Sequence, residues 1–336
     1  MTEDRGWTEI YEGGSPEAEE AIFLSLAQGM QQVQEANRRR MGTPRASRTL
    51  HSKMVAGVTN AFITVDRALP PDFVVAHFQP GASLDAAVRF SNASGVPQPD
   101  GAPDMRGAAI RIGLADGGIH DLLMTSFPVS HARDARQFVT FAMIAAGDRE
   151  TLFPRLIEAF GPEEAQRMGT NIRQGVRLCA SFALESFWSR GAILWGGHPV
   201  RFQLRPACAP NIPHSEDVAT DADALTGELA ARLAQTPVRY RLALQRFVDE
   251  TLTPIEDGSI EWTEQASPPI EIATLVIPMQ DLHGPEGKAR AGQVEQMAFN
   301  PFNAPAEFRP LGNLNRARRL VYARSAAGWV TPAAPA

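Results

Sequence analysis

The sequence predicts an α+β fold in which short strands dominate the middle of the chain. Three observations support this class: a long amphipathic segment comes first, several short segments of strand composition follow, and a helical stretch interrupts them. Turns rich in Gly, Pro and Asp separate the strand segments. Short strands in sequential order favour antiparallel pairing, and the pattern alone leaves a closed barrel and a sandwich open.

The first expected element is a helix that begins at Pro16 and runs to about Arg40. A serine precedes it as a typical N-cap, proline suits the first helical position, and acidic residues precede arginines as the helix dipole favours. We expect residues 1–40 to form an N-terminal helical segment and residues 41–330 to form the main domain. The Pro- and Ala-rich tail, residues 331–336, is expected to be disordered.

Strand signals fall into two groups on either side of a helical stretch. The first group covers residues 60–66, 85–91, 107–113 and 120–126. Apolar spacing of three and four indicates helices from residue 134 to about residue 180. The pattern of the last predicted helix covers residues 163–187. The second group covers residues 200–206, 238–249 and 270–278. A Pro-rich loop then leads into a short helix that is expected to end at Tyr322.

Composition argues against several classes of function. The chain has 336 residues and a net charge of −6, whereas nucleic-acid-binding domains are usually basic. No apolar run reaches the ~18 residues of a membrane span, and the polar, acidic N-terminus differs from a signal peptide, so a cytoplasmic location is expected. Cys179 and Cys208 lack the spacing of a metal site or a disulfide framework.

Arg318 and Tyr322 form the strongest functional signal. They lie four residues apart in a segment of good helix formers, so their side chains are expected to be adjacent on one helix face. A neighbouring guanidinium favours a phenolate, which is the form of tyrosine that binds ferric iron. Neither Tyr11 nor Tyr240 has an arginine in this position. Taken alone, such a pair also fits an ordinary surface helix.

The segment from Val294 to Tyr322 resembles the proximal haem-binding side of haem catalases. Its run VEQMAFNPFNAP follows the family pattern V-E-Q-hydrophobic-A-F-x-P-x-N-x-P, and the R-x-x-x-Y pair follows at almost the family spacing. The resemblance implies haem b as cofactor, Tyr322 as axial ligand of the iron and Arg318 as its charge partner. It also implies an eight-stranded antiparallel β-barrel with helices packed outside, and a haem-binding role for residues 41–330.

Two further blocks resemble the distal side of the same family. The block RTLHSKMVAGVTNAFITV begins at Arg48 and places His51 at the family's distal histidine. His51 is then the general acid–base, because cleavage of a peroxide O–O bond needs a proton moved between the two oxygens. The block AVRFSNASG implies that Ser91 hydrogen-bonds His51, and that Arg48 and Arg89 bind the haem propionates through their planar forks.

A fourth block, HDLLMTSFPVSHARDARQF, resembles the family segment that carries the distal asparagine. Phe138 keeps the aromatic residue expected over the haem, but Thr125 stands at the catalytic asparagine position, and Ser130 and His131 replace a Phe-Phe pair. A shorter hydroxyl at that position implies weak peroxide dismutation. His131 is not expected to be catalytic. After Tyr322 the family's last propionate-binding arginine also has no counterpart.

The resemblance implies a haem-dependent, peroxide-reactive oxidoreductase, namely a peroxidase with weak catalase activity. Its partners would be hydrogen peroxide or an organic hydroperoxide and a small organic reductant, with no nucleic acid and no membrane span. One alternative is a fatty-acid hydroperoxide isomerase or lyase of the allene oxide synthase type, and another is a non-catalytic haem-binding protein. The long arm of full-length catalases has no counterpart here, so a monomer or homodimer is expected.

Overall fold

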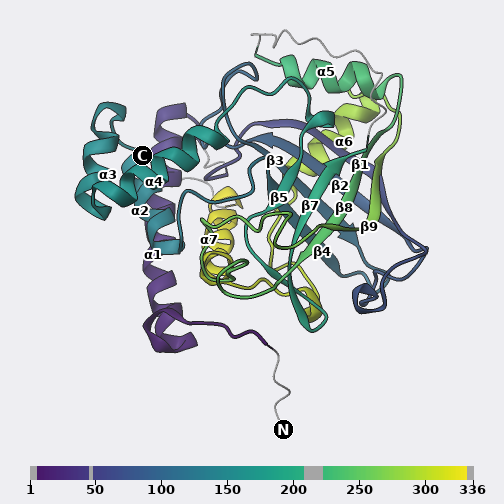
Figure 1. Cartoon of the computed structure of the whole chain (residues 1–336). Helices are drawn as coiled ribbons and strands as arrows, with labels where there is room; N and C mark the ends of the chain where they lie inside the picture. The colour runs from purple at the N-terminus through teal and green to yellow at the C-terminus, as the bar shows by residue number, and fades with distance from the viewer. Residues whose placement is uncertain (1–5, 45–47, 208–221, 331–336) are drawn as a thin grey trace.

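The structure is a computed structural model that describes residues 6–44, 48–207 and 222–330. Its centre is one antiparallel sheet, whose strands are β1 Met54–Val65, β2 Ser83–Asn92, β3 Arg106–Gly113, β4 Ile119–Thr125, β5 Phe187–Ser189, β6 Ile193–Trp195, β7 His198–Pro206, β8 Val238–Arg246 and β9 Ile270–Ile277. The order is β5-β4-β3-β2-β1-β9-β8-β7-β6, and β5 also pairs with β7. Eight strands therefore close a ring that β6 extends, and the predicted eight-stranded barrel is confirmed (Figure 1).

Helices pack outside this barrel. They are α1 Pro16–Met41, α2 Ala135–Ala145, α3 Leu152–Phe160, α4 Pro162–Gly175, α5 Ala224–Leu233, α6 Pro285–Gln296 and α7 Asn313–Val330. Figure 1 shows α1 to α4 gathered on one side of the barrel, with α7 between α1 and the strands. A small apolar cluster with residues of α1, α2 and α7 joins these helices to one another. The C-terminal helix is thus held between the helical layer and the barrel.

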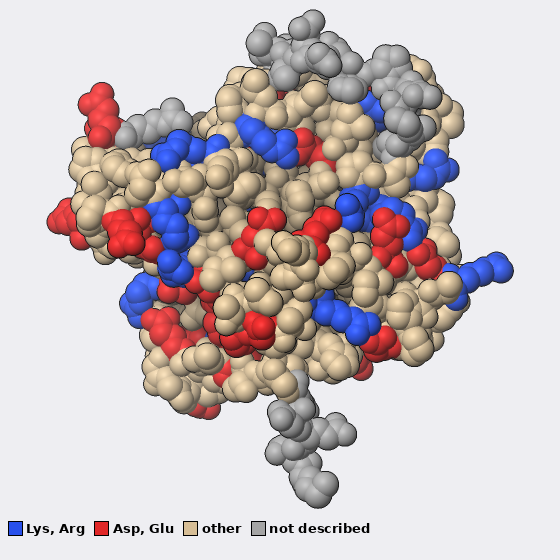
Figure 2. Space-filling model, viewed as in Figure 1, with Lys and Arg blue, Asp and Glu red and all other residues tan. Residues whose placement is uncertain are grey.

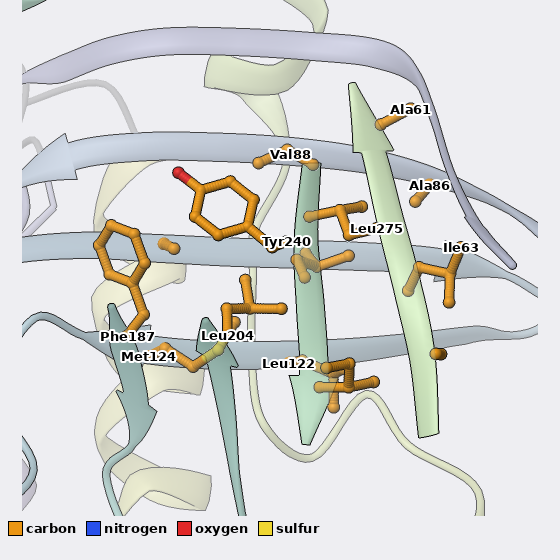
Figure 3. Packing of buried hydrophobic residues seen from close by; sticks show 14 of the residues in the cluster. Ala61, Ile63, Ala86, Val88, Leu122, Met124, Phe187, Leu204, Tyr240 and Leu275 are labelled. Atoms are coloured by element: carbon orange, nitrogen blue, oxygen red, sulfur yellow. The ribbon is translucent and has the colours of Figure 1, made fainter. Parts of the chain in front are cut away.

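The barrel interior is filled by apolar side chains from alternate positions of the strands. Ile63, Val88, Leu122, Tyr240 and Leu275 are all at most 1% exposed and point into one core (Figure 3). Because successive strand residues point to opposite faces, the residues between them face outward. The interior is therefore a packed core, and the polar residues that alternate with it lie on the outer face.

The first helix forms as the sequence predicts. The Ser15 side chain accepts a hydrogen bond from the Ala18 backbone N–H at 3.2 Å, and Pro16 occupies the first turn. The helix ends at Met41, where Gly42 adopts a left-handed conformation with φ of 64°. Local capping chemistry is sufficient to define both ends.

Some boundaries differ from the sequence prediction because tertiary pairing decides them. The first strand begins at Met54 rather than at Asn60, since Met54 pairs with Ser91 of β2 beyond an irregularity in the register. The helix predicted over residues 163–187 ends at Gly175. The chain then forms an isolated β-bridge between Arg177 and Asp104 before it reaches β5. Strands of three residues such as β5 and β6 carry no alternation that a sequence pattern could reveal.

The C-terminal part of the chain also departs from expectation. The last helix continues to Val330 instead of ending at Tyr322, and β8 ends at Arg246 instead of Asp249. Helices α5 and α6 were not expected at all. The tail expected to be disordered, residues 331–336, lies outside the described residues.

No helix within the described ranges is long and apolar enough to span a membrane. Figure 2 shows basic and acidic side chains interspersed over the visible face. Opposite charges so mixed largely cancel beyond a Debye length of ~8–10 Å. This face therefore carries no large patch of a single charge (Figure 2).

A pair of histidines fills a gap between aromatic rings. His77 Nε2 lies 3.1 Å from His120 Nδ1, and the ring centroids of His120 and Phe308 are 4.7 Å apart. Burial lowers the pKa of His120 to about 3, and the neighbouring His77 acts in the same direction. Burial also lowers the pKa of His77 to about 4. Both imidazoles are therefore neutral in the folded protein at neutral pH.

The neutral state of His120 predicts an acid-sensitive fold. Between its folded pKa of about 3 and the unfolded value of ~6.5, only the unfolded chain binds the proton, so stability is lost as pH falls through this window. We expect this residue to cost about 2 kcal/mol of unfolding free energy at pH 5. His120→Phe should flatten the change between pH 7.5 and pH 5 in urea unfolding. His283→Gln, at an exposed position, serves as control, and an unchanged slope in His120→Phe would contradict the assignment.

Candidate functional site

Helix α7 presents Arg318 and Tyr322 on one face, as their spacing predicts. Arg318 Nη2 donates to Tyr322 Oη at 2.8 Å, and the guanidinium carbon lies 4.9 Å from the centre of the tyrosine ring. A second nitrogen, Arg318 Nη1, donates to Asn315 Oδ1 at 2.9 Å. Asn315 is itself held by donating to the Ala192 carbonyl at 2.9 Å. The phenol oxygen therefore has a cation in fixed contact.

The first turn of α7 is tied to the rest of the molecule by charged and polar groups. Gly312 precedes the helix with φ of 82°, and a Cβ there would lie 2.3 Å from a backbone oxygen of Ile255. Arg316 Nε donates to Glu19 Oε2 at 2.7 Å, and its Nη1 donates to Glu256 Oε1 at 2.9 Å. These ties fix the position of the helix that carries the tyrosine.

The cross-strand register of β2, β3 and β4 builds the opposite part of the site. Ser91 pairs with Gly107, and Gly107 pairs with Thr125, so the three residues form one row. Val88 and Phe90 of β2 lie in the barrel core, so Ser91 and its row face outward. The outer face of the barrel thus presents two hydroxyl groups with a glycine between them.

His51 packs onto this row. His51 Nδ1 lies 3.1 Å from Ser91 Oγ, which is hydrogen-bonding distance. A Cβ at Gly107 would lie 2.4 Å from the same ring nitrogen, so only glycine leaves room for the imidazole. The backbone of His51 has φ of 56°, in the left-handed region that non-glycine residues seldom adopt. Such strain is concentrated at functional sites.

The environment of His51 keeps its imidazole neutral. Burial lowers its pKa to about 3, and the positive charges of nearby arginines add to this effect. These arginines are Arg89, Arg190, Arg318 and Arg48. A neutral imidazole has one nitrogen free to accept a proton, and the surrounding cations favour anionic groups.

Arg48 and Arg89 come together as the sequence predicts, but they share an acidic partner that it did not. Arg48 Nη1 lies 2.6 Å from Glu295 Oε1, and Arg89 Nε lies 3.1 Å from Glu295 Oε2. Burial and the charge of Arg89 lower the pKa of Arg48 to about 10. Two guanidinium groups thus meet one carboxylate that is itself 41% exposed. The pair is arranged to bind carboxylates and retains excess positive charge.

Arg190 is a site residue that sequence reasoning missed. Its Nη1 donates to Thr125 Oγ1 at 3.1 Å, to the Phe127 carbonyl at 3.3 Å and to the Val129 carbonyl at 2.8 Å. Thr125 Oγ1 also lies 3.3 Å from the Phe127 carbonyl. The residue directly follows β5, so no sequence pattern signalled its position. It organises the segment that carries Thr125.

Phe138 connects the two parts of the site. It packs against one apolar cluster together with Leu50, next to His51, and Val321, next to Tyr322. The aromatic side chain expected over the cofactor therefore packs against the same apolar cluster as the sequence neighbours of His51 and Tyr322. Its position brings together residues from three elements that are far apart in sequence.

The donor set fits a ferric haem. Tyr322, paired with an arginine, suits an axial phenolate ligand. The neutral imidazole of His51 suits a distal base. The excess positive charge of Arg48 and Arg89 suits the haem propionates. Within the described part of the chain, no cluster of three or more His, Cys, Asp or Glu could hold a bare metal ion. The residues present are thus of the kinds that a haem would need.

Comparisons with known proteins agree with this geometry. A family model described as catalase matches residues 17–154. A catalase-related peroxidase of Mycolicibacterium paratuberculosis is 30% identical over an alignment of 265 residues that covers 73% of this chain and 78% of that protein. The family model covers the strands that carry Ser91, Gly107 and Thr125.

Solved catalases share the fold. A fungal catalase has a TM-score of 0.69 at 19% identity, over 86% of this chain and 60% of its own. Catalase A from Saccharomyces cerevisiae has a TM-score of 0.69 at 17% identity, over 86% and 62%. A bacterial catalase has a TM-score of 0.62 at 18% identity, over 85% and 58%.

This chain spans about 60% of the length of these solved catalases, and at such identities the likeness concerns the fold. The relatedness in sequence comes from the peroxidase match, which covers more than two thirds of both proteins. The closed barrel is the fold that the solved catalases share. On the strength of the sequence match, the chain belongs to the catalase family.

Proposed function

We propose that the protein is a haem b-dependent peroxidase with weak catalase activity. It would act on hydrogen peroxide or an organic hydroperoxide and oxidise a small organic reductant. The observation that carries this proposal is a neutral His51 that lies within hydrogen-bonding distance of Ser91 and feels the charge of Arg318, the arginine that donates to Tyr322. The similarity to a protein named catalase-related peroxidase supports it.

In this proposal some site residues bind the cofactor and another transfers the proton. Tyr322 would ligate the iron, Arg318 would stabilise its phenolate, and Arg48 and Arg89 would hold propionates. When bound, haem supplies the redox chemistry of peroxide cleavage. His51 accepts a proton from the peroxide at Nε2 and returns it to the departing oxygen, because Ser91 engages only Nδ1.

Thr125 accounts for the expected weakness of dismutation. Its hydroxyl is already engaged by Arg190 and by the Phe127 carbonyl. A hydroxyl held in this way is less available to a second peroxide molecule than a longer amide side chain would be. Once the first peroxide has reacted, an organic reductant therefore completes turnover more readily than a second peroxide.

We further propose a cytoplasmic monomer or homodimer with no nucleic-acid partner. The helical segment 1–40 would support a haem-binding domain at residues 41–330. Support for this division comes from α1, which packs against α7 and so holds the helix that carries Tyr322. Size-exclusion chromatography with light scattering tests the oligomeric state.

Tyr322→Phe should abolish tyrosinate ligation of haem. Without the phenol oxygen the iron would lose its proposed ligand, so haem content should fall and the visible spectrum should change. Absorbance per mole of reconstituted protein measures both. Tyr11→Phe is a matched control, because Tyr11 also lies against an arginine, Arg316, with 4.7 Å between the guanidinium carbon and the ring centre. An unchanged spectrum in Tyr322→Phe would sink the assignment.

His51→Ala should retain haem but react ~10²–10⁴-fold more slowly with hydrogen peroxide, the range typical of a lost general acid–base. Because the pKa of His51 is lowered to about 3, the wild-type rate should stay flat from pH 8 to pH 5. It should decline only as the imidazole becomes protonated in stronger acid. Stopped-flow spectroscopy measures the rate, and a near-wild-type rate in His51→Ala would remove this residue from the mechanism.

Thr125→Asn should raise oxygen release relative to reductant oxidation. The longer amide can reach a second peroxide where the engaged threonine hydroxyl cannot. Oxygen evolution and dye oxidation, measured on the same haem-loaded sample, give the ratio directly. Wild-type oxygen release at the rate of true catalases would refute the peroxidase proposal. Rapid loss of a fatty-acid hydroperoxide without a reductant would instead favour the isomerase or lyase alternative.

A further inference from the structure

A polar contact joins the distal loop to the C-terminal helix at a place that the proposed mechanism does not use. Thr49 lies two residues before His51. Ser325 lies three residues after Tyr322 on α7, which is almost one helical turn. Thr49 Oγ1 is 3.0 Å from Ser325 Oγ, which is hydrogen-bonding distance. One pair of hydroxyl groups therefore links the segment of the proposed base to the helix of the proposed iron ligand.

Helix α1 supports this link from one side. Gln34 Nε2 donates to the Ser325 carbonyl and to Ser325 Oγ, both at 3.2 Å. Gln34 is 5% exposed and Thr49 is 6% exposed, so little water reaches these groups. Because a hydrogen bond between buried groups is costly to lose, the cluster favours one arrangement of the loop, α1 and α7.

The distal loop around Thr49 is fixed by contacts of its own. Asn37 Nδ2 donates to the Thr49 carbonyl at 3.1 Å, and a Cβ at Gly95 would lie 2.3 Å from the same oxygen. Two residues further on, the His51 backbone N–H donates to the Ala93 carbonyl at 2.9 Å. The hydroxyl of Thr49 therefore has a defined position relative to the backbone of His51.

Helix α7 is tied at its first turn and again beyond the tyrosine. Ion pairs of Arg316 hold the first turn. On the far side of Tyr322, Gln34 ties Ser325 to α1 and Thr49 ties it to the distal loop. The apolar cluster of α1, α2 and α7 also holds the helix, but packing is non-directional and allows small shifts that a hydrogen bond opposes. Without the Thr49 contact, the helix can shift relative to the loop.

We propose that the hydrogen bond between Thr49 and Ser325, supported by Gln34, fixes the spacing of His51 and Tyr322 across the haem site. The inference rests on the proposed peroxidase function and deepens it, because the distance from the base to a bound peroxide depends on that spacing. A misplacement of ~1 Å can slow a catalysed step by ~10²-fold. In the proposed mechanism neither hydroxyl touches the cofactor or the peroxide, so Thr49 and Ser325 are positioning residues.

Amide hydrogen exchange of the full chain, before haem is added, tests the link itself. Thr49→Val nearly keeps the shape of the side chain and removes the hydroxyl. Exchange should become about fivefold faster in residues 48–52 and in residues 322–328, because both segments lose one net hydrogen bond. Gln31→Leu is the matched control, since it removes a contact of α1 with Arg324 of α7 at 3.4 Å and should leave residues 48–52 unchanged. Unchanged exchange in Thr49→Val would overturn the proposal.

Cyanide and nitric oxide test the spacing on haem-loaded protein without turnover. Hydrogen cyanide gives up a proton when it binds ferric haem, so its association rate depends on where the distal base lies, whereas nitric oxide has no proton to lose. Thr49→Val should retain haem, slow cyanide binding about tenfold and leave nitric oxide binding within about twofold. Stopped-flow spectroscopy measures both rates. Equal slowing of both ligands, or slowing of neither, would contradict the positioning role.

Two more variants separate positioning from a folding defect. Thr49→Ser restores the hydroxyl and should return cyanide binding to within about twofold of the wild-type rate. Ser325→Ala breaks the same bond from the side of the helix and should also slow cyanide binding. Adding Ser325→Ala to Thr49→Val should change the rate by less than about twofold further, because both changes remove one interaction. Effects that multiply in the double variant would refute the inference.

Failure of the proposed function shows separately from failure of this inference. A protein that takes up no haem, or that oxidises no reductant with peroxide, would count against the peroxidase function. The exchange experiment needs neither haem nor turnover, so it still decides whether Thr49 and Ser325 hold the distal loop and α7 together.

Discussion

The register of β2, β3 and β4 is the constraint on which the distal site depends. It places Ser91, Gly107 and Thr125 in one row on the outer face of the barrel. Because side chains alternate along a strand, a slip of one residue would turn this row into the apolar core. The barrel excludes such a slip, since closure through β5 and β7 leaves each of the eight strands in the ring paired on both sides. The strand register of the barrel thus determines where the His51 imidazole packs.

The proximal side depends on a different kind of interaction. Arg318 and Tyr322 are adjacent through helix geometry alone, but their place relative to the barrel follows from polar ties at the start of α7. Asn313 Oδ1 accepts from the Ala135 backbone N–H at 2.8 Å, and Arg316 bonds Glu19 at 2.7 Å. These ties link α7 to α1 and α2, so the helical layer positions the tyrosine while the barrel positions the histidine.

Arginine is the common element of the site. Arg48 and Arg89 meet at Glu295, Arg318 contacts the tyrosine, and Arg190 braces the threonine segment. Their combined charge lowers the pKa of His51 beyond the effect of burial and keeps it neutral. The same charges would stabilise a phenolate and propionates. In the proposed mechanism, one set of arginines would therefore both bind the cofactor and keep His51 neutral.

The sequence by itself determined the features that arise from neighbours along the chain. These are the capped first helix, most strands, and the contact between Arg318 and Tyr322, which lie one helical turn apart. Family resemblance supplied the barrel and the contact between His51 and Ser91. Only the tertiary structure decided three contacts between distant residues. His51 packs against Gly107, Arg48 binds Glu295 at a separation of 247 residues, and Arg190 donates to Thr125 at a separation of 65 residues. Such contacts follow from strand register and helix docking, which a local pattern of residues does not encode.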